Sequence, residues 1–222
     1  MILEISEVTD VLKHLDGLSA VIFDLDDTLY PEKEYVRSGY HEAAKLLPQL
    51  PDAEDRFWRA FESGENAFDK VLKDAGMFSE ELKAQCLQAY RSNPHPDIHL
   101  YSGIRDMLQA LRDKGLKTGI ITDGRPEGQR AKLNALGLQN IVDHIIITDE
   151  LGGPEFRKPC PKAFKLMQKE LAVPFAAMAY VGDNPAKDFK APERLGMRSI
   201  WFRNAEGLYG YPGTEALKEK ES

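Results

Sequence analysis

Five short apolar runs, each followed by polar residues, recur along this chain and limit the folds that it can adopt. The runs are rich in β-branched residues and too short to form a buried helix, so they predict strands. Apolar and polar side chains do not alternate in them, which is typical of strands buried on both faces of a sheet. The runs are Ala20-Val21-Ile22-Phe23 and residues 117–124, 144–149, 178–184 and 198–204.

Segments with helical periodicity lie between these runs. Ile104, Leu108 and Leu111 share one helical face, and Gly115 follows them. A similar stripe in residues 161–171 begins with a proline, which suits a first helical turn. Strands that alternate with helices of this length indicate βαβ units. The sequence therefore predicts an α/β protein with a parallel sheet.

Three carboxylates crowd the end of the first predicted strand. Asp24, Asp26 and Asp27 follow this strand at once, and like charges so close together repel one another. A divalent cation relieves the repulsion, and Mg²⁺ prefers oxygen ligands such as carboxylates and substrate phosphate. Ligands of open α/β sheets bind outside the carboxyl ends of the strands. We therefore expect a Mg²⁺ site at this edge; the alternative is an acidic loop without chemistry.

A long segment without strand signals separates the first two predicted strands. From Pro31 to Pro96 the apolar residues recur with helical spacing, and prolines and glycines divide the segment into three to four short helices. Most of its aromatic residues are expected to form the core of a small bundle. Because the segment begins directly after the acidic cluster, we expect it to act as a mobile lid that excludes water and selects the substrate.

The composition is that of an ordinary globular protein and disfavours several classes of partner. Of the 222 residues, 42% are hydrophobic and 29% are charged, and the net charge of −7 disfavours nucleic acid and anionic membranes. No apolar stretch has the pattern of a transmembrane helix or a secretory signal. Cys86 and Cys160 form no CxxC pair and no zinc spacing, which fits a cytoplasmic protein. The charged tail from about Gly213 is expected to fray.

Four motifs, taken in order, resemble those of the haloacid dehalogenase-like (HAD) hydrolase superfamily. They are Asp24-Leu25-Asp26-Asp27-Thr28-Leu29, Ile121-Thr122-Asp123-Gly124, Arg157-Lys158-Pro159 and Gly182-Asp183-Asn184-Pro185-Ala186-Lys187-Asp188. The resemblance implies a Rossmann-like core, residues 1–30 and 97–222, with a helical cap of subfamily I at residues 31–96. The first motif has an acid, Asp26, two residues after Asp24. In this respect it resembles the motif of the phosphatase and phosphomutase branch rather than that of the dehalogenases.

The resemblance also implies the catalytic roles. Asp24 is expected to be the nucleophile that forms an aspartyl-phosphate intermediate, and Asp26 to protonate the leaving oxygen and then activate water. Lys158 is expected to place a cation beside both Asp24 and the transferring phosphoryl group. The expected phosphate-binding residues are Thr122, Asp123, Gly124 and Lys158.

A Mg²⁺ site follows from the same resemblance. Its expected ligands are Asp24, Asp26 and Asp183. Asp188 is expected to orient Lys158 or a water molecule on the metal, and Asn184 to help hold the loop. Two of the expected ligands, Asp24 and Asp26, are thus also expected catalytic residues, as are Thr122 and Lys158.

These observations predict a Mg²⁺-dependent phosphohydrolase that acts on a small phosphorylated metabolite. A phosphomutase of the β-phosphoglucomutase type shares every motif. A receiver-like signalling module also gathers acids, a threonine and a lysine at strand ends, but it is shorter and lacks a helical insertion. Sugar phosphates, nucleotides, phosphoglycolate and phosphorylated amino acids are all compatible substrates. We expect a monomer or a small homo-oligomer with no nucleic-acid or membrane partner.

Overall fold

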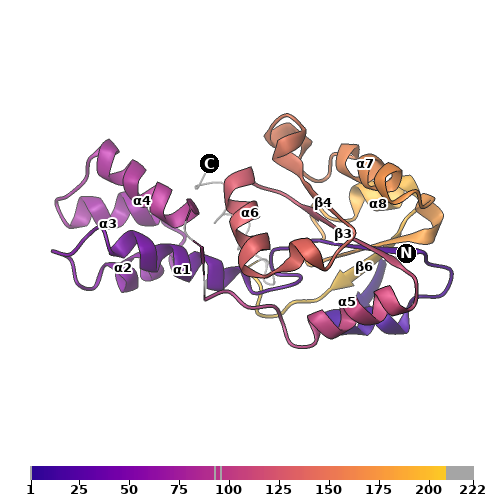
Figure 1. Ribbon diagram of the computed structural model, residues 1–222. Helices are drawn as coiled ribbons and strands as arrows, with labels where there is room; N and C mark the ends of the chain where they lie inside the picture. Colours follow the sequence, from indigo (N-terminus) through magenta and orange to yellow (C-terminus); the bar gives the residue numbers. More distant parts are fainter. Residues whose placement is uncertain (1, 93, 96, 209–222) are drawn as a thin grey trace.

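A parallel sheet of six strands forms the centre of the larger part of the molecule in the computed structural model, which describes residues 2–92, 94–95 and 97–208 (Figure 1). The strands are β1 (Ile2–Ile5), β2 (Ala20–Phe23), β3 (Lys117–Thr122), β4 (His144–Ile147), β5 (Met178–Gly182) and β6 (Arg198–Phe202). Their order is β1-β6-β5-β2-β3-β4, and every neighbouring pair is parallel. The predicted Rossmann-like α/β fold is confirmed. Pro96 and the tail from about Gly213 lie outside the described residues.

Strand β1 is the one element of the sheet that the sequence did not reveal. It pairs along its whole length with β6 at the edge of the sheet. Only Ile5 of its four residues is buried, and Glu4 is exposed. A run of four residues that is only partly buried has too weak a hydrophobic pattern to distinguish a strand from a polar terminus.

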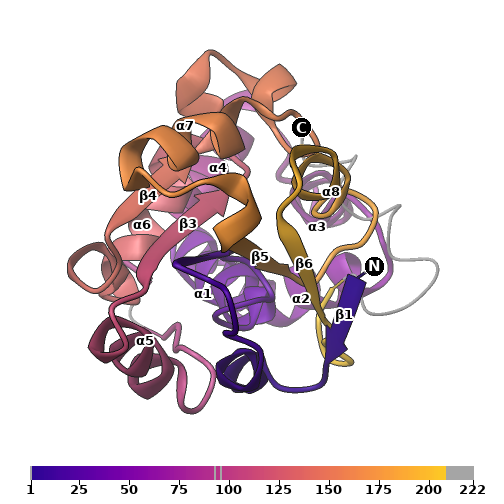
Figure 2. The ribbon, with the colours of Figure 1, turned by 90° about the vertical axis from the view of Figure 1, so that its right-hand side faces the viewer.

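Helices cover both faces of the sheet. Those beside it are α5 (Ile104–Asp113), α6 (Pro126–Ala135), α7 (Lys162–Leu171) and α8 (Lys190–Leu195), with short 3-10 turns at Val8–Lys13, Leu138–Asn140, Thr148–Leu151, Pro154–Phe156 and Phe175–Ala177. Val21 and Phe23 pack into the core shared with α5 and α6, whereas Ala20 and Ile22 pack into the core shared with α7 and α8. Figure 2 shows α5 and α7 on opposite sides of the sheet. Burial on both faces explains the apolar runs without alternation.

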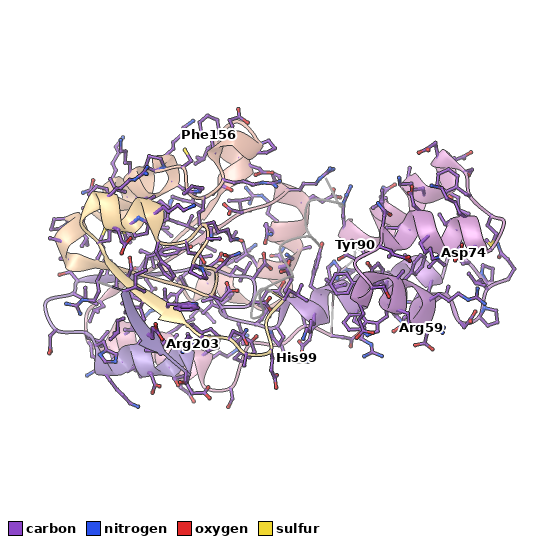
Figure 3. The ribbon with its side chains drawn as sticks, turned by 180° about the vertical axis from the view of Figure 1, so that it is seen from behind. Arg59, Asp74, Tyr90, His99, Phe156 and Arg203 are labelled. Carbon is purple, nitrogen blue, oxygen red and sulfur yellow. The ribbon has the colours of Figure 1, made fainter. Side chains whose placement is uncertain are left out.

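The segment between β2 and α5 folds into four helices within the described residues. They are α1 (Glu32–Ala44), α2 (Ala53–Glu62), α3 (Ala67–Asp74) and α4 (Glu80–Ser92). We call α1–α4 the helical insertion, which stands to one side of the sheet (Figure 1). Figure 3 shows Tyr90 at the end nearer the sheet and Arg59 and Asp74 farther away. The predicted three to four helices are confirmed, and no helix in the described part of the chain is long and apolar enough to cross a membrane.

Aromatic rings fill the helical insertion, as expected from their spacing. The ring of Tyr40 lies 5.4 Å from that of Phe57 and 5.3 Å from that of Tyr90, measured between centroids. A β-carbon at Gly39 would lie 2.4 Å from the Tyr90 ring, so only glycine allows α4 to approach α1 this closely. This packing fills the insertion with apolar side chains that are continuous with the core on the α5 and α6 face of the sheet.

Asp27 fixes the point where the chain leaves the sheet for the insertion. Its backbone is left-handed, with φ of 52°. One carboxylate oxygen accepts a hydrogen bond from the N–H of Glu32 at 2.9 Å, and the other accepts one from the N–H of Leu208 at 2.7 Å. The side-chain amide of Asn204 donates to the Asp27 carbonyl at 2.8 Å. The start of α1 is therefore tied to the segment that follows β6.

Candidate active site

The carboxyl ends of three neighbouring strands bring the predicted motifs together. Strand β2 lies between β3 and β5, so the residues that follow these strands meet at one edge. Asp24 follows β2, Asp123 follows β3 and Asp183 follows β5. Asp24 and Asp183 are buried. The edge of the sheet at which the sequence predicted a site is thus the place where these carboxylates gather.

Lys158 lies at the centre of this group. Its ammonium is 2.8 Å from Asp24 Oδ1 and 2.8 Å from Asp188 Oδ1, and it donates a hydrogen bond to the Tyr180 hydroxyl at 2.9 Å. Its main-chain N–H donates to Asp123 Oδ1 at 3.0 Å, which anchors the loop before α7. Burial lowers the pKa of Lys158, but the carboxylates of Asp188 and Asp24 raise it further, and the net shift is well above its usual range. The buried lysine is therefore charged.

Asp24, Asp183 and Asp188 form a compact trio of buried carboxylates. One ligand atom of each lies within 4.8 Å of the others. Burial raises the pKa of Asp24 to about 6 against the opposing charge of Lys158, and burial and Asp188 raise the pKa of Asp183 well above its usual range. We call the trio together with Lys158 the Lys158 cluster. Its excess of negative charge and its oxygen donors suit a hard divalent cation.

The turn after β5 positions Asp188 within this trio. A β-carbon at Gly182 would lie 2.5 Å from Asp188 Oδ2, so glycine lets this carboxylate fold back over the strand end. The same oxygen accepts a hydrogen bond from the N–H of Asn184 at 2.9 Å. Asn184 Oδ1 accepts one from the N–H of Ala186 at 3.0 Å. Asn184 thus holds the turn, while Asp188 contacts Lys158 directly.

Asp26 has a different set of partners. Its Oδ1 accepts hydrogen bonds from the Tyr30 hydroxyl at 2.6 Å and from the Lys132 ammonium at 2.7 Å. Its Oδ2 accepts one from the Gln129 amide at 3.1 Å. The carboxylate of Asp26 is therefore directed to α6 and does not belong to the buried trio around Asp24.

Lys132 connects Asp26 to the helical insertion. Its ammonium lies 4.0 Å from Glu32 Oε1 and 4.2 Å from the centre of the Tyr35 ring, both on α1. The Tyr35 ring in turn lies 4.2 Å from the ring of His95. Burial lowers the pKa of Lys132, but Asp26 and Glu32 raise it to a net upward shift, so this buried lysine is also charged. We call Asp26, Glu32, Tyr35, His95 and Lys132 the Lys132 cluster.

The end of β3 offers groups suited to a phosphoryl oxygen. The hydroxyl of Thr122 is buried and has no hydrogen-bond partner among the described residues. Gly124 has φ of 132°, and a β-carbon there would lie 2.7 Å from the Gln129 amide. The side chain of Asp123 instead accepts hydrogen bonds from the Thr148 hydroxyl and the Lys158 N–H. Thr122 therefore has free hydrogen-bonding capacity, and Asp123 joins two loops.

Three residues near the site had no role predicted from the sequence, although one of them, Lys187, lies within the fourth motif. The ammonium of Lys187 lies 3.8 Å from Asp24 Oδ2 and 3.5 Å from Asp123 Oδ2. Gln129 and Lys132 bind Asp26 from α6. Their spacing of three residues puts both on one helical face, but most lysines are solvated, so spacing alone could not single them out.

Comparison with known proteins agrees with this geometry. The family model described as haloacid dehalogenase-like hydrolase matches residues 18–196, so the chain belongs to this family. The chain is 31% identical to the glyceraldehyde 3-phosphate phosphatase of Methanocaldococcus jannaschii over 86% of its length and 87% of that protein. It is 30% identical to the phosphoserine phosphatase of Thermus thermophilus over 78% of its length and 67% of that protein.

A solved structure gives the same result. The HAD phosphatase from Thermococcus onnurineus is 27% identical, covers 84% of this chain and 87% of its own, and superposes with a TM-score of 0.55. Together with the named relatives, the family match defines the chain as a phosphoric monoester hydrolase. The predicted HAD membership and phosphatase class are confirmed. The match also favours the hydrolase over a receiver-like signalling module.

Proposed function

We propose that this phosphatase hydrolyses a small phosphorylated metabolite with Mg²⁺, through a phosphorylated Asp24. The observation that carries the proposal is the contact of Lys158 with both Asp24 and Asp188 at 2.8 Å inside a buried acidic trio. A buried carboxylate held beside a fixed cation is prepared to attack a phosphoryl group.

The acidic trio supports the choice of metal. Asp24, Asp183 and Asp188 supply only oxygen donors, and Asp24 Oδ2 is buried without a hydrogen-bond partner. Asp24 and Asp183 would bind Mg²⁺, while Asp188, whose carboxylate contacts Lys158 and the Asn184 N–H, would orient Lys158 beside the metal. The carboxylate of Asp26, the third expected ligand, is bound to Lys132, so Asp26 would reach the metal through another of its groups. Bound Mg²⁺ would neutralise charge on the phosphoryl oxygens.

The protein's own residues account for two steps, the phosphorylation of Asp24 and the hydrolysis of the phosphorylated Asp24. Asp24 attacks phosphorus, so that a bond from the carboxylate to phosphorus forms while the bond to the leaving oxygen breaks. Lys158 and Thr122 hold the equatorial oxygens of the phosphoryl group. Water then attacks the phosphorus, which releases inorganic phosphate and frees Asp24. Asp26 gives a proton to the leaving oxygen and takes one from the water, which requires its carboxylate to exchange Lys132 for the substrate.

The relatives support a small substrate. By their names, they act on glyceraldehyde 3-phosphate and on phosphoserine, which are both three-carbon phosphate monoesters. We propose a substrate of the same class, for an enzyme that works in the cytoplasm as a monomer or a small homo-oligomer. A screen over a panel of phosphorylated metabolites would identify the substrate. Net release of inorganic phosphate in this screen would distinguish a phosphatase from a phosphomutase.

We also propose that residues 31–96 form the cap and residues 1–30 and 97–222 the catalytic core. Two observations support this division. Helix α1 begins just after the acidic loop, and its residues Glu32 and Tyr35 contact Lys132 on α6. A cap of this kind moves as a body and selects the substrate. Exchange of the insertion with that of a relative should transfer substrate preference; an active chimera with the original ranking would disprove this role.

The mechanism can be tested with the purified protein. It should hydrolyse an aryl phosphate with Mg²⁺ and stop when a chelator is added. Asp24→Asn should abolish turnover and the covalent phosphoenzyme, because an amide is a poor nucleophile. Full activity after exhaustive metal removal, or turnover by Asp24→Asn, would overturn the proposal.

A further inference from the structure

The two carboxylate oxygens of Asp24 differ in their surroundings. Oδ1 accepts a hydrogen bond from the Leu25 N–H at 2.8 Å and lies 2.8 Å from the Lys158 ammonium. Oδ2 is buried without a hydrogen-bond partner, and the Lys187 ammonium is 3.8 Å from it. This distance is too long for a hydrogen bond. A second cation therefore stands beside the free oxygen of the nucleophile without engaging it.

Lys187 has unused hydrogen-bonding capacity, unlike Lys158. An ammonium group has three donors. Those of Lys158 face two carboxylates at 2.8 Å and a hydroxyl at 2.9 Å. Among the described residues, the ion pairs of Lys187 are those with Asp24 at 3.8 Å and Asp123 at 3.5 Å. A further oxygen atom could thus bind Lys187 without displacing a strong contact.

The charge and position of Lys187 suit an incoming anion. Burial and Lys158 lower the pKa of Lys187, but Asp24, Asp188 and Asp123 raise it to a net upward shift, so it is charged. Its side chain is 25% exposed, whereas that of Lys158 is fully buried. The Asn184 carbonyl accepts hydrogen bonds from the N–H groups of Lys187 and Asp188, which fixes the turn. Of the two lysines beside Asp24, Lys187 is therefore the one whose side chain reaches solvent, from which a substrate arrives.

We propose that Lys187 is a second phosphate-binding cation, which contacts the transferring phosphoryl group beside Asp24 Oδ2, whereas Lys158 contacts Oδ1. The proposal rests on the proposed function, in which Asp24 attacks phosphorus. The negative charge of the phosphoryl group is spread over its equatorial oxygens during transfer, so a second ammonium can stabilise it. The competing interpretation is that Lys187 only offsets the charge of the acidic residues when no metal is bound.

Binding of inorganic phosphate separates the two interpretations. Phosphate would be titrated by calorimetry into the native protein and the variants Lys187→Gln and Lys187→Arg, all saturated with Mg²⁺. Lys190→Gln is the matched control, because Lys190 is an exposed lysine that begins α8. Lys187→Gln should weaken phosphate binding and lower kcat/KM by about 10- to 100-fold, the loss expected for a hydrogen bond to a charged group. Lys187→Arg should restore part of both.

The outcomes are distinct. Unchanged phosphate affinity in a folded, active Lys187→Gln protein would overturn the inference, above all if its Mg²⁺ affinity rises. If Lys187→Gln fails to fold, Lys187→Arg decides: it should retain phosphate binding weaker than that of the native protein, and native affinity would count against a specific contact. A native protein that neither binds phosphate nor hydrolyses phosphate esters would overturn the proposed function and this inference together.

Discussion

Two buried lysine–aspartate pairs, Lys158–Asp24 and Lys132–Asp26, take their aspartates from the same loop after β2. They differ in the elements that hold the two side chains in place. The Lys158 cluster is built from the ends of β2 and β5 and the loop before α7, all in the sheet part of the molecule. The Lys132 cluster joins α6 to Glu32 and Tyr35 of the helical insertion. The first is therefore fixed by the sheet itself, whereas the second depends on where the insertion lies. We expect the residues of the Lys158 cluster to perform the attack on phosphorus. In the Lys132 cluster, we expect the position of the insertion to determine whether the Asp26 carboxylate is bound to Lys132 or available to the substrate.

After the loss of Asp24, the largest expected effect comes from Asp26, the residue of the Lys132 cluster that must act in the chemistry. Asp26→Asn should lower kcat/KM by about 10²–10⁴-fold for alkyl phosphates, because the leaving alkoxide needs a proton. Aryl phosphates should lose less, because their leaving groups need little help. Steady-state kinetics with both classes checks this. Equal losses, with the chemical step limiting in both, would remove Asp26 from the role of general acid.

Lys158→Met should break the other half of the comparison. Turnover should fall by about 10²–10³-fold, the usual loss when a charge-stabilising group is removed. The loss should be the same for aryl and alkyl phosphates, because Lys158 faces Asp24 and not the leaving group. Lys165→Met, a change at an exposed lysine on α7, is the control. A loss that depends on the leaving group would contradict the separation of the two clusters.

Lys132→Met should act mainly on stability. It removes the ammonium that lies beside the buried carboxylates of Asp26 and Glu32, and the loss of one partner of a buried ion pair typically lowers the free energy of unfolding by about 3–5 kcal/mol. Denaturant titration with and without Mg²⁺ tests this. Mg²⁺ should offset the corresponding loss in Lys158→Met, whose carboxylates form the trio, but not in Lys132→Met. Equal rescue of both variants would show that the metal site includes the Lys132 cluster.

The smallest expected effect is a pH dependence from His95. Burial and the charge of Lys132 lower the pKa of His95 to about 4, against an ordinary 6.5, while Glu42 acts in the opposite direction. Between these values the unfolded histidine binds more protons than the folded one, so the contribution of His95 to the free energy of unfolding falls as the pH drops from about 6.5 to about 4. The raised pKa of Asp24 acts in the opposite direction, so the effect of His95 is measured as the difference between the slopes of the native protein and the variant. The slope contributed by His95 is at most about 1.4 kcal/mol per pH unit.

His95→Asn should remove this slope. Asparagine tolerates the left-handed backbone of position 95, where φ is 46°, and does not titrate in this range. His144→Asn, at a partly exposed histidine in β4, serves as the control and should keep the native slope. Urea unfolding followed across this pH range gives the measurement. A native slope that survives in His95→Asn would assign it to other groups.

The sequence by itself determined the sheet and the positions of most candidate site residues. Apolar runs without alternation specify strands buried on both faces, and the acids that follow them must meet where the carboxyl ends of parallel strands meet. Asp24, Asp123 and Asp183 could be placed at one edge for this reason. Strand β1 could not be found, because it is short and only partly buried and because its partner β6 lies far along the chain.

The family resemblance predicted that Lys158 lies beside Asp24, but only the tertiary structure decided the other charge pairs. Sequence spacing put Asp26 beside Asp24, but the folded chain brings Lys132 from α6 to Asp26 and leaves Asp188 beside Asp24. Lys187 is likewise one lysine among many until folding places it 3.8 Å from Asp24. Coulombic energy depends on separation in space and on burial, and neither is encoded in local sequence pattern. The sequence pattern could therefore identify the carboxylates. The packing of distant helices and turns determined that Lys132 and Lys187 lie beside them.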